Sequence, residues 1–144
     1  MNILRAAALG MALAIGCSPS TAAPPPPPVD RSGKGAVLCI WMMTSLVREA
    51  SRRCDLPDRS PELDRELDDA IDRIEAFIMT NASAPPKDIR KARKAMIADQ
   101  VGRDFCKYIP ELYSAHRAQG PAALREGIDD LLSVPREPLM NPCV

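Results

Sequence analysis

The chain has 144 residues, which is enough for one domain of moderate size. It carries 19 basic and 19 acidic residues, so its formal net charge at pH 7 is zero. This balance argues against the capture of nucleic acid or of an anionic membrane by charge, since both need a basic excess. Because only 3% of the residues are aromatic, the composition also favours helices over strands.

The first residues are typical of an export signal. A short cationic start at residues 1–5 precedes an apolar run from Ala6 to Ile15. Such a run, of about ten residues, is too short to span the hydrocarbon layer of a bilayer, which is roughly 30 Å thick. It therefore predicts a signal peptide, and a protein that works outside the cytoplasm of a bacterium.

Residues 14–17, Ala-Ile-Gly-Cys, resemble a bacterial lipobox. In a lipobox, cleavage before the cysteine exposes a residue that carries acyl chains, which here would be Cys17. The signal peptide would then be 1–16, and the protein would be a lipoprotein held at a membrane through an N-terminal lipid anchor. The sequence departs from the pattern at Ala14, where leucine is usual.

The alternative is ordinary signal-peptide cleavage after Ala22, which would make the signal peptide 1–22 and the product soluble in the periplasm or secreted. We favour acylation because five consecutive prolines, residues 24–28, follow the cysteine. Polyproline forms a stiff, extended helix and suits a spacer between a folded domain and a surface. We therefore predict a proline-rich disordered tether over 17–34 and a folded domain over 35–144.

Four cysteines remain in the predicted domain: Cys39, Cys54, Cys106 and Cys143. An even number of cysteines in an oxidising compartment predicts two disulfides. Zinc is disfavoured, because no two of these cysteines have the short spacing of a CxxC pair. Cys39 and Cys54 fall on one predicted helix about 22 Å apart, which excludes a bond between them.

Hydrophobic periodicity predicts helices over 35–54 and 61–81, and a third that begins after Pro86 and carries Ile89 to Tyr108. Ser60 and Pro61 have the residue types of a helix cap and of a first helical position.

Further along, Pro110 is expected to interrupt the chain. A short segment then covers 111–119, and a final helix begins near Pro121.

Short connections favour antiparallel neighbours, so the simplest fold is all-α: a small bundle of about four helices in up-down-up-down order, stapled by two disulfides. In that bundle the first and third helices run parallel, which places Cys54 and Cys106 at one end. The last helix returns the chain to the other end and brings Cys143 to Cys39. We therefore predict the disulfides Cys54–Cys106 and Cys39–Cys143.

Val37 and Trp41 point away from the main apolar stripe of the first predicted helix. If nothing covers them, they would form an exposed patch of the kind that binds a protein partner. The alternative, which we favour, is that the C-terminal tail, tied at Cys143 to Cys39, lies over them. The patch is nevertheless the candidate partner site that we single out.

No motif indicates catalysis, a cofactor or a metal site. His116 is the only histidine, and no serine or cysteine is marked by its local sequence as a nucleophilic partner. The acidic residues of 61–81 lack the glycine-containing loop of a calcium site and are typical of a solvated face. The basic cluster at 87–94 is expected to complement that face by charge. We therefore predict no catalytic residue, no cofactor and no metal ligand.

These features favour a non-enzymatic cell-envelope protein that presents a helical binding or structural domain. The alternative is a periplasmic inhibitor or immunity-type protein directed against an enzyme that acts on the envelope, an idea that rests on size and compartment alone. An enzyme is the least favoured class, because its residues would have to come together from separate helices that no local motif marks.

Overall fold

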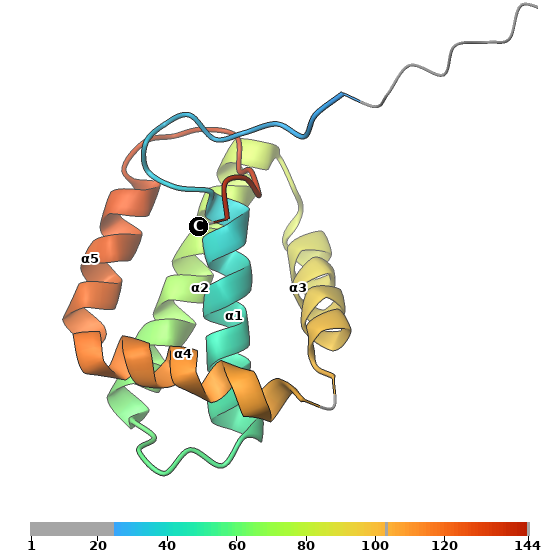
Figure 1. Cartoon of the computed structure of the whole chain (residues 1–144). Helices are drawn as coiled ribbons and strands as arrows, with labels where there is room; N and C mark the ends of the chain where they lie inside the picture. The colour runs from blue at the N-terminus through green and yellow to red at the C-terminus, as the bar shows by residue number, and fades with distance from the viewer. Residues whose placement is uncertain (1–24, 103, 144) are drawn as a thin grey trace, which may run out of the picture.

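The computed structural model describes residues 25–102 and 104–143, and this part of the chain is helical without any named strand (Figure 1). It contains five helices: α1 (Val37–Arg53), α2 (Pro61–Ala82), α3 (Pro86–Gln100), α4 (Phe105–Gln119) and α5 (Pro121–Leu132). The predicted all-α fold is therefore confirmed, with one helix more than expected.

Local signals account for several helix ends. The Ser60 hydroxyl accepts a hydrogen bond from the backbone N–H of Leu63 at 3.2 Å, as an N-cap does. Proline occupies the first position of α2, α3 and α5, where its missing N–H removes no helical hydrogen bond. At the other end of α2, Ser83 adopts the left-handed conformation with φ 51°, which terminates the helix.

The prediction of one helix through Tyr108 and a break at Pro110 was wrong. The helix ends at Gln100, a new one begins at Phe105, and Pro110 lies inside α4. A proline in a helix removes one backbone hydrogen bond, a loss that tertiary packing can offset. Here Phe105 and Tyr113 are both buried and hold α4 against the core on either side of the proline.

Four of the five helices follow the predicted up-down-up-down order, namely α1, α2, α3 and α5, while α4 lies across one end of them (Figure 1). The α1–α2 pair is central, with α3 and α5 on opposite sides of it. Helix α4 contacts α1 and α5, so it closes the end of the bundle at which α1 finishes.

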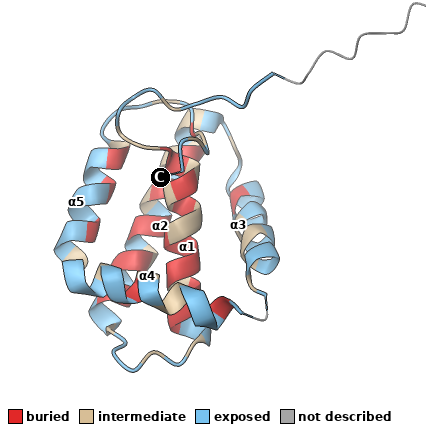
Figure 2. Ribbon diagram, viewed as in Figure 1, coloured by how far each residue is buried: buried red, intermediate tan, exposed pale blue. Residues whose placement is uncertain are grey.

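Buried hydrophobic residues line the inward faces of the helices (Figure 2). The larger cluster lies between α1, α2 and α5 and includes Val47, Leu67, Ile74 and Ile128. A smaller cluster of Leu46, Ala50 and Phe105 lies where α4 crosses α1. Helix α3 buries only Ile89, so it is the most lightly attached helix and we expect its amides to exchange fastest.

Both predicted disulfides are present. Cys39 joins Cys143 and Cys54 joins Cys106, each with a Cα–Cα distance of 5.4 Å. The first bond fixes the C-terminal tail to the start of α1. The second fixes the start of α4 to the residue that follows α1, at the opposite end of the bundle.

The two ends of the described chain are clasped together. Val29 and Asn141 form an isolated parallel β-bridge, and the Asp30 N–H donates to the Asn141 carbonyl at 2.7 Å. Arg136 donates to the Asp30 carboxylate at 2.8 Å and to the Gly35 carbonyl at 2.7 Å. Part of the tether predicted over 17–34 therefore belongs to the folded domain, because the chain packs on the C-terminal tail from Val29 onward.

This clasp predicts a loss of stability in acid. Burial would raise the pKa of Asp30, but hydrogen bonds from Arg136 and Ser32 outweigh it and lower that pKa from 3.8 to about 2. Because the pKa is lower in the folded state, the stabilisation is present above about pH 4 and is lost as the pH falls through about 2. Urea unfolding across this pH range should show that loss.

In the variant Asp30→Asn, the loss of folding stability on acidification should be smaller than in the unmodified chain. Asp58→Asn, which removes an exposed partner of Arg117, is the control. Equal acid dependence in Asp30→Asn and in the unmodified chain would contradict the assignment.

Candidate functional site

The acidic face of α2 is not the simple solvated face that we predicted. Asp64, Glu66 and Glu75 are buried. Glu66 pairs with Arg125 of α5, and Glu75 pairs with Arg93 of α3 at 3.0 Å. Buried carboxylates persist only when they are paired and hydrogen-bonded, and here flanking helices supply the arginines.

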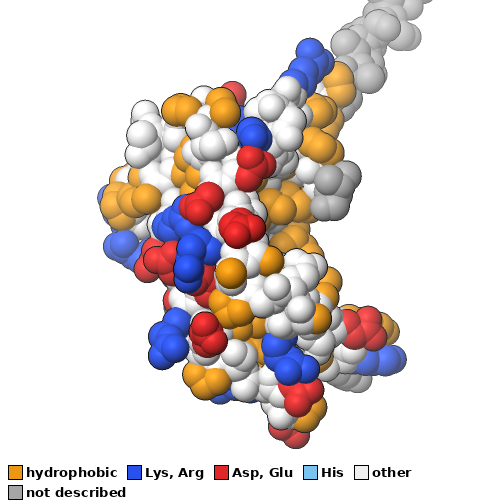
Figure 3. All heavy atoms as spheres, turned by 90° about the vertical axis from the view of Figure 1, so that its left-hand side faces the viewer, with side chains coloured by type: hydrophobic (Ala, Val, Ile, Leu, Met, Phe, Trp, Pro, Cys, Tyr) orange, Lys and Arg blue, Asp and Glu red, His pale blue; other side chains and the backbone are white. Residues whose placement is uncertain are grey.

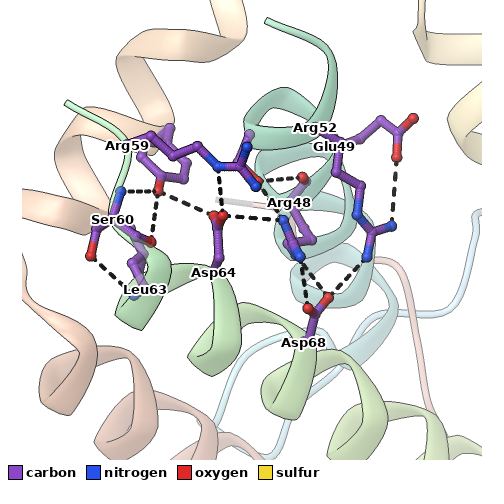
Figure 4. Close-up of polar contacts among 10 residues, drawn as sticks. Arg48, Glu49, Arg52, Arg59, Ser60, Leu63, Asp64 and Asp68 are labelled. Carbon is purple, nitrogen blue, oxygen red and sulfur yellow. Dashed lines mark hydrogen bonds and ion pairs between the residues drawn. The ribbon is translucent and has the colours of Figure 1, made fainter. Parts of the chain in front are cut away.

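Arg48 of α1 is the centre of the polar network between α1 and α2 (Figure 4). Its Nε and Nη2 each donate to the Asp68 carboxylate at 2.8 Å, which is a two-pronged ion pair. Its Nη1 donates to the Ser51 hydroxyl at 2.6 Å and lies 3.4 Å from the Asp64 carboxylate. One guanidinium therefore connects two turns of α2 to α1.

Asp64 extends this network to α4. Its carboxylate accepts from Arg59 Nε at 2.8 Å and from the Tyr113 hydroxyl at 3.2 Å. The same hydroxyl accepts a hydrogen bond from the Ser60 N–H at 2.9 Å. Tyr113 thus ties α4 to the start of α2.

The network stays ionised at neutral pH. The hydrogen bond from Arg48 lowers the pKa of Asp68 and raises that of Arg48 itself. Burial would raise the pKa of Asp64, but Arg59, Ser51 and Arg48 outweigh it and lower the pKa. Burial raises the pKa of Tyr113, which keeps its hydroxyl protonated as a donor.

Replacing Tyr113 with phenylalanine should lower the free energy of unfolding by about 1–2 kcal/mol. The change removes one hydroxyl and leaves the part-buried Ser60 N–H and the buried Asp64 without that partner. Tyr108→Phe is a matched control in the same helix, because Tyr108 is exposed and should change stability by less than about 0.5 kcal/mol. Equal effects of the two substitutions in urea unfolding would contradict the role given to Tyr113.

A charged pocket of about 210 Å³ opens beside the network, between α1, α2 and α3. Its charged lining consists of Arg48, Arg52, Asp68, Asp72 and Arg93. Each of these arginines already pairs with a carboxylate, so an ionic ligand would have to compete with existing pairs. Within the described residues, the buried Ser45 hydroxyl of this pocket has no hydrogen-bond partner. The arrangement is best suited to holding the three helices together.

The predicted patch of Val37 and Trp41 does not form. Val37 is 0% exposed and Trp41 is 7% exposed. The Trp41 indole donates to Glu75 of α2 at 3.1 Å, and Glu75 in turn pairs with Arg93 of α3. The covered arrangement that we favour above is therefore present, and at Trp41 the cover comes from α2 and α3, which the periodicity of one helix cannot reveal. The tail runs beside Leu38, whose N–H donates to the Leu139 carbonyl at 2.9 Å.

Of the other residues singled out from the sequence, Cys17 lies outside the described residues. In the basic cluster of α3, Arg93 pairs with α2 as predicted, whereas Lys87, Arg90, Lys91 and Lys94 form no ion pair within residues 25–102 and 104–143. Charge complementarity between these two helices therefore rests on a single pair.

A second pocket was not predicted from the sequence. It has a volume of about 230 Å³ and lies between α1, α4 and α5; we call it the α1–α4–α5 pocket. Ile40, Leu124, Ile128 and Leu131 make its lining largely apolar, and His116 and Gln119 of α4 add polar groups. His116 is partly buried, and this burial lowers its pKa, so that the imidazole is neutral at pH 7.

On the face that includes α5, acidic and basic side chains lie next to one another, with hydrophobic side chains visible between them (Figure 3). Two ion pairs here join α5 to α2, namely Arg125 with Glu66 and Arg73 with Asp129. These pairs fix one side of α5, while the α1–α4–α5 pocket lies on the side of the helix that faces α1 and α4.

Among the described residues, no group of three or more His, Cys, Asp or Glu side chains is arranged to hold a metal ion. None of the described helices is both long enough and apolar enough to cross a membrane. Comparisons of the chain with protein-family models, curated protein sequences and solved structures found no match. The functional assignment therefore rests on the residues and their geometry.

Proposed function

We propose that the chain is an exported protein of the bacterial cell envelope, a non-enzymatic binding domain held at a membrane through an acylated Cys17. The observation that carries this proposal is the pair of disulfides, each of which joins cysteines far apart in the sequence. Structural disulfides of this kind form and persist in oxidising compartments, whereas the cytoplasm keeps thiols reduced. The apolar run and proline-rich segment that precede the domain agree with export and tethering.

The geometry also supports a tethered arrangement. The N-terminal segment joins the domain at the end of the bundle that holds the C-terminal tail, and α4 lies at the opposite end (Figure 1). A tether attached in this way would direct α4 away from the membrane, so that this end of the bundle would be open to the periplasm.

The experiment that tests this proposal is fractionation of cells that produce the full chain, followed by intact-mass measurement. The wild type should remain with membranes and have the mass expected for cleavage before Cys17 plus acyl chains. Cys17→Ala should be soluble and lack the acyl mass, while both proteins should gain about four protons on reduction. A soluble wild type that begins near Ala23 would remove the lipid anchor from the proposal, and a chain retained in the cytoplasm with free thiols would overturn it.

A further inference from the structure

We propose that the α1–α4–α5 pocket binds a small neutral molecule with an apolar body and a single hydrogen-bonding group, of the size of phenol or a short alcohol. The inference gives a ligand class to the proposed binding domain. It does not depend on the lipid anchor.

The apolar body is matched by the walls of the pocket. Leu124, Ile128 and Leu131 of α5 are buried, and they line the cavity together with Ile40 of α1. The volume of about 230 Å³ exceeds the roughly 150 Å³ at which an apolar protein cavity accepts benzene. One ring or a short alkyl chain therefore fits.

Gly127 is the second observation that points to a ligand. It lies in the middle of α5, where glycine destabilises a helix by roughly 0.5–1 kcal/mol relative to alanine. Its backbone has no positive φ that would require glycine, and a Cβ added there would meet no atom within 4 Å. Gly127 is exposed and lines the pocket, so its missing side chain leaves the mouth of the pocket open.

The polar groups favour a neutral ligand. His116 and Gln119 lie on the α4 side, and a neutral imidazole offers both a donor and an acceptor. The one cationic group of the lining, Lys34, is already paired with Asp130 at 2.5 Å. No unpaired positive charge of the lining is left to attract an anion, so an alcohol or phenol is favoured over a carboxylate.

The test uses the mature full-length protein with both disulfides formed, titrated with phenol, toluene and benzoate while amide and imidazole NMR signals are recorded. The three probes share one ring and differ in their polar group. We expect phenol to bind more tightly than toluene or benzoate. Its binding should shift NMR signals of α5 and of His116. Tighter binding of benzoate, or no binding of phenol, would overturn the proposal.

Substitutions assign the binding to this pocket. Gly127→Leu should abolish the phenol-induced shifts, because a Cβ at this lining position meets no atom within 4 Å and the longer side chain would occupy the pocket. Ala122→Leu adds the same side chain to a position of the same helix that does not line the pocket, and this variant should bind phenol as the wild type does. If Gly127→Leu does not fold, Ala123→Leu narrows the pocket from another position and should weaken binding. Phenol binding that survives both pocket substitutions would overturn the assignment, and either result leaves the test of the lipid anchor unaffected.

Discussion

Replacing Cys39 and Cys143 with alanine is expected to lower the free energy of unfolding by about 4 kcal/mol. The bond closes a sequence separation of 104 residues, and in the chain-entropy view a disulfide stabilises by restricting the unfolded chain. Release of the tail should also expose the start of α1, because Leu38 would lose its fixed partner at Leu139. Equilibrium unfolding in urea measures the first effect, and limited proteolysis of the tail measures the second.

The two disulfides are nested, and this nesting sets their relative effects. Cys54–Cys106, with a separation of 52 residues, lies within the loop closed by Cys39–Cys143. When the inner bond is intact, the outer bond closes only the remaining 52 residues, from 39–54 and 106–143. Removing the inner pair should therefore cost about 4 kcal/mol, the same as removing the outer pair.

A large difference between the two double-alanine variants would contradict this account. Suppose that the outer pair stabilised the protein by several kcal/mol more than the inner pair. The contacts of the clasped tail would then have to contribute much more to the free energy of unfolding than the restriction of the unfolded chain does. Wild-type protein measured under the same oxidising conditions is the reference for both variants.

Replacing Arg48 with methionine should destabilise the protein by about 3 kcal/mol. Methionine keeps much of the buried aliphatic length, so the loss reports mainly the guanidinium, which pairs with Asp68 and Asp64. Asp64 has only 7% of its side chain exposed, and removing one partner of a buried ion pair typically costs about 3–5 kcal/mol. The remaining contact of Asp64 with Arg59 places the expected value at the lower end of that range.

Arg52→Met is the matched control, because Arg52 contacts the same Asp68 carboxylate from the same helix. Its side chain is 53% exposed, and exposed ion pairs contribute about 0–1 kcal/mol. Urea unfolding at neutral pH compares the two variants directly. Comparable losses would mean that Arg48 acts as an ordinary surface arginine and that the network does not hold α1 to α2.

Features that depend on neighbouring residues were predictable from the sequence. Ser60 and Pro61 marked the start of α2 because a cap and a first-turn proline act within one turn. The disulfides were predictable because an alternating bundle leaves few ways to bring four cysteines together, and the chain indeed alternates through α1, α2, α3 and α5.

Features that depend on distant residues were not predictable. The acidic face of α2 gave no sign that Glu66 would meet Arg125, since the partner comes from another helix. Trp41 looked available because nothing in its own helix shows that α2 and α3 cover it. The α1–α4–α5 pocket combines residues from Lys34 to Leu131, and the only local sign of it is Gly127 in an otherwise regular helix.

The nested disulfides also affect how the protein would respond to proteases. A cut between residues 55 and 105 would leave fragments joined through both disulfides, and a cut elsewhere between Cys39 and Cys143 would leave them joined through Cys39–Cys143 alone. The exposed connection that follows α1, which includes Asp58 and Arg59, is the kind of site that proteases attack first. One nick there would leave a single covalent molecule of nearly unchanged mass, which only a reductant separates into two chains.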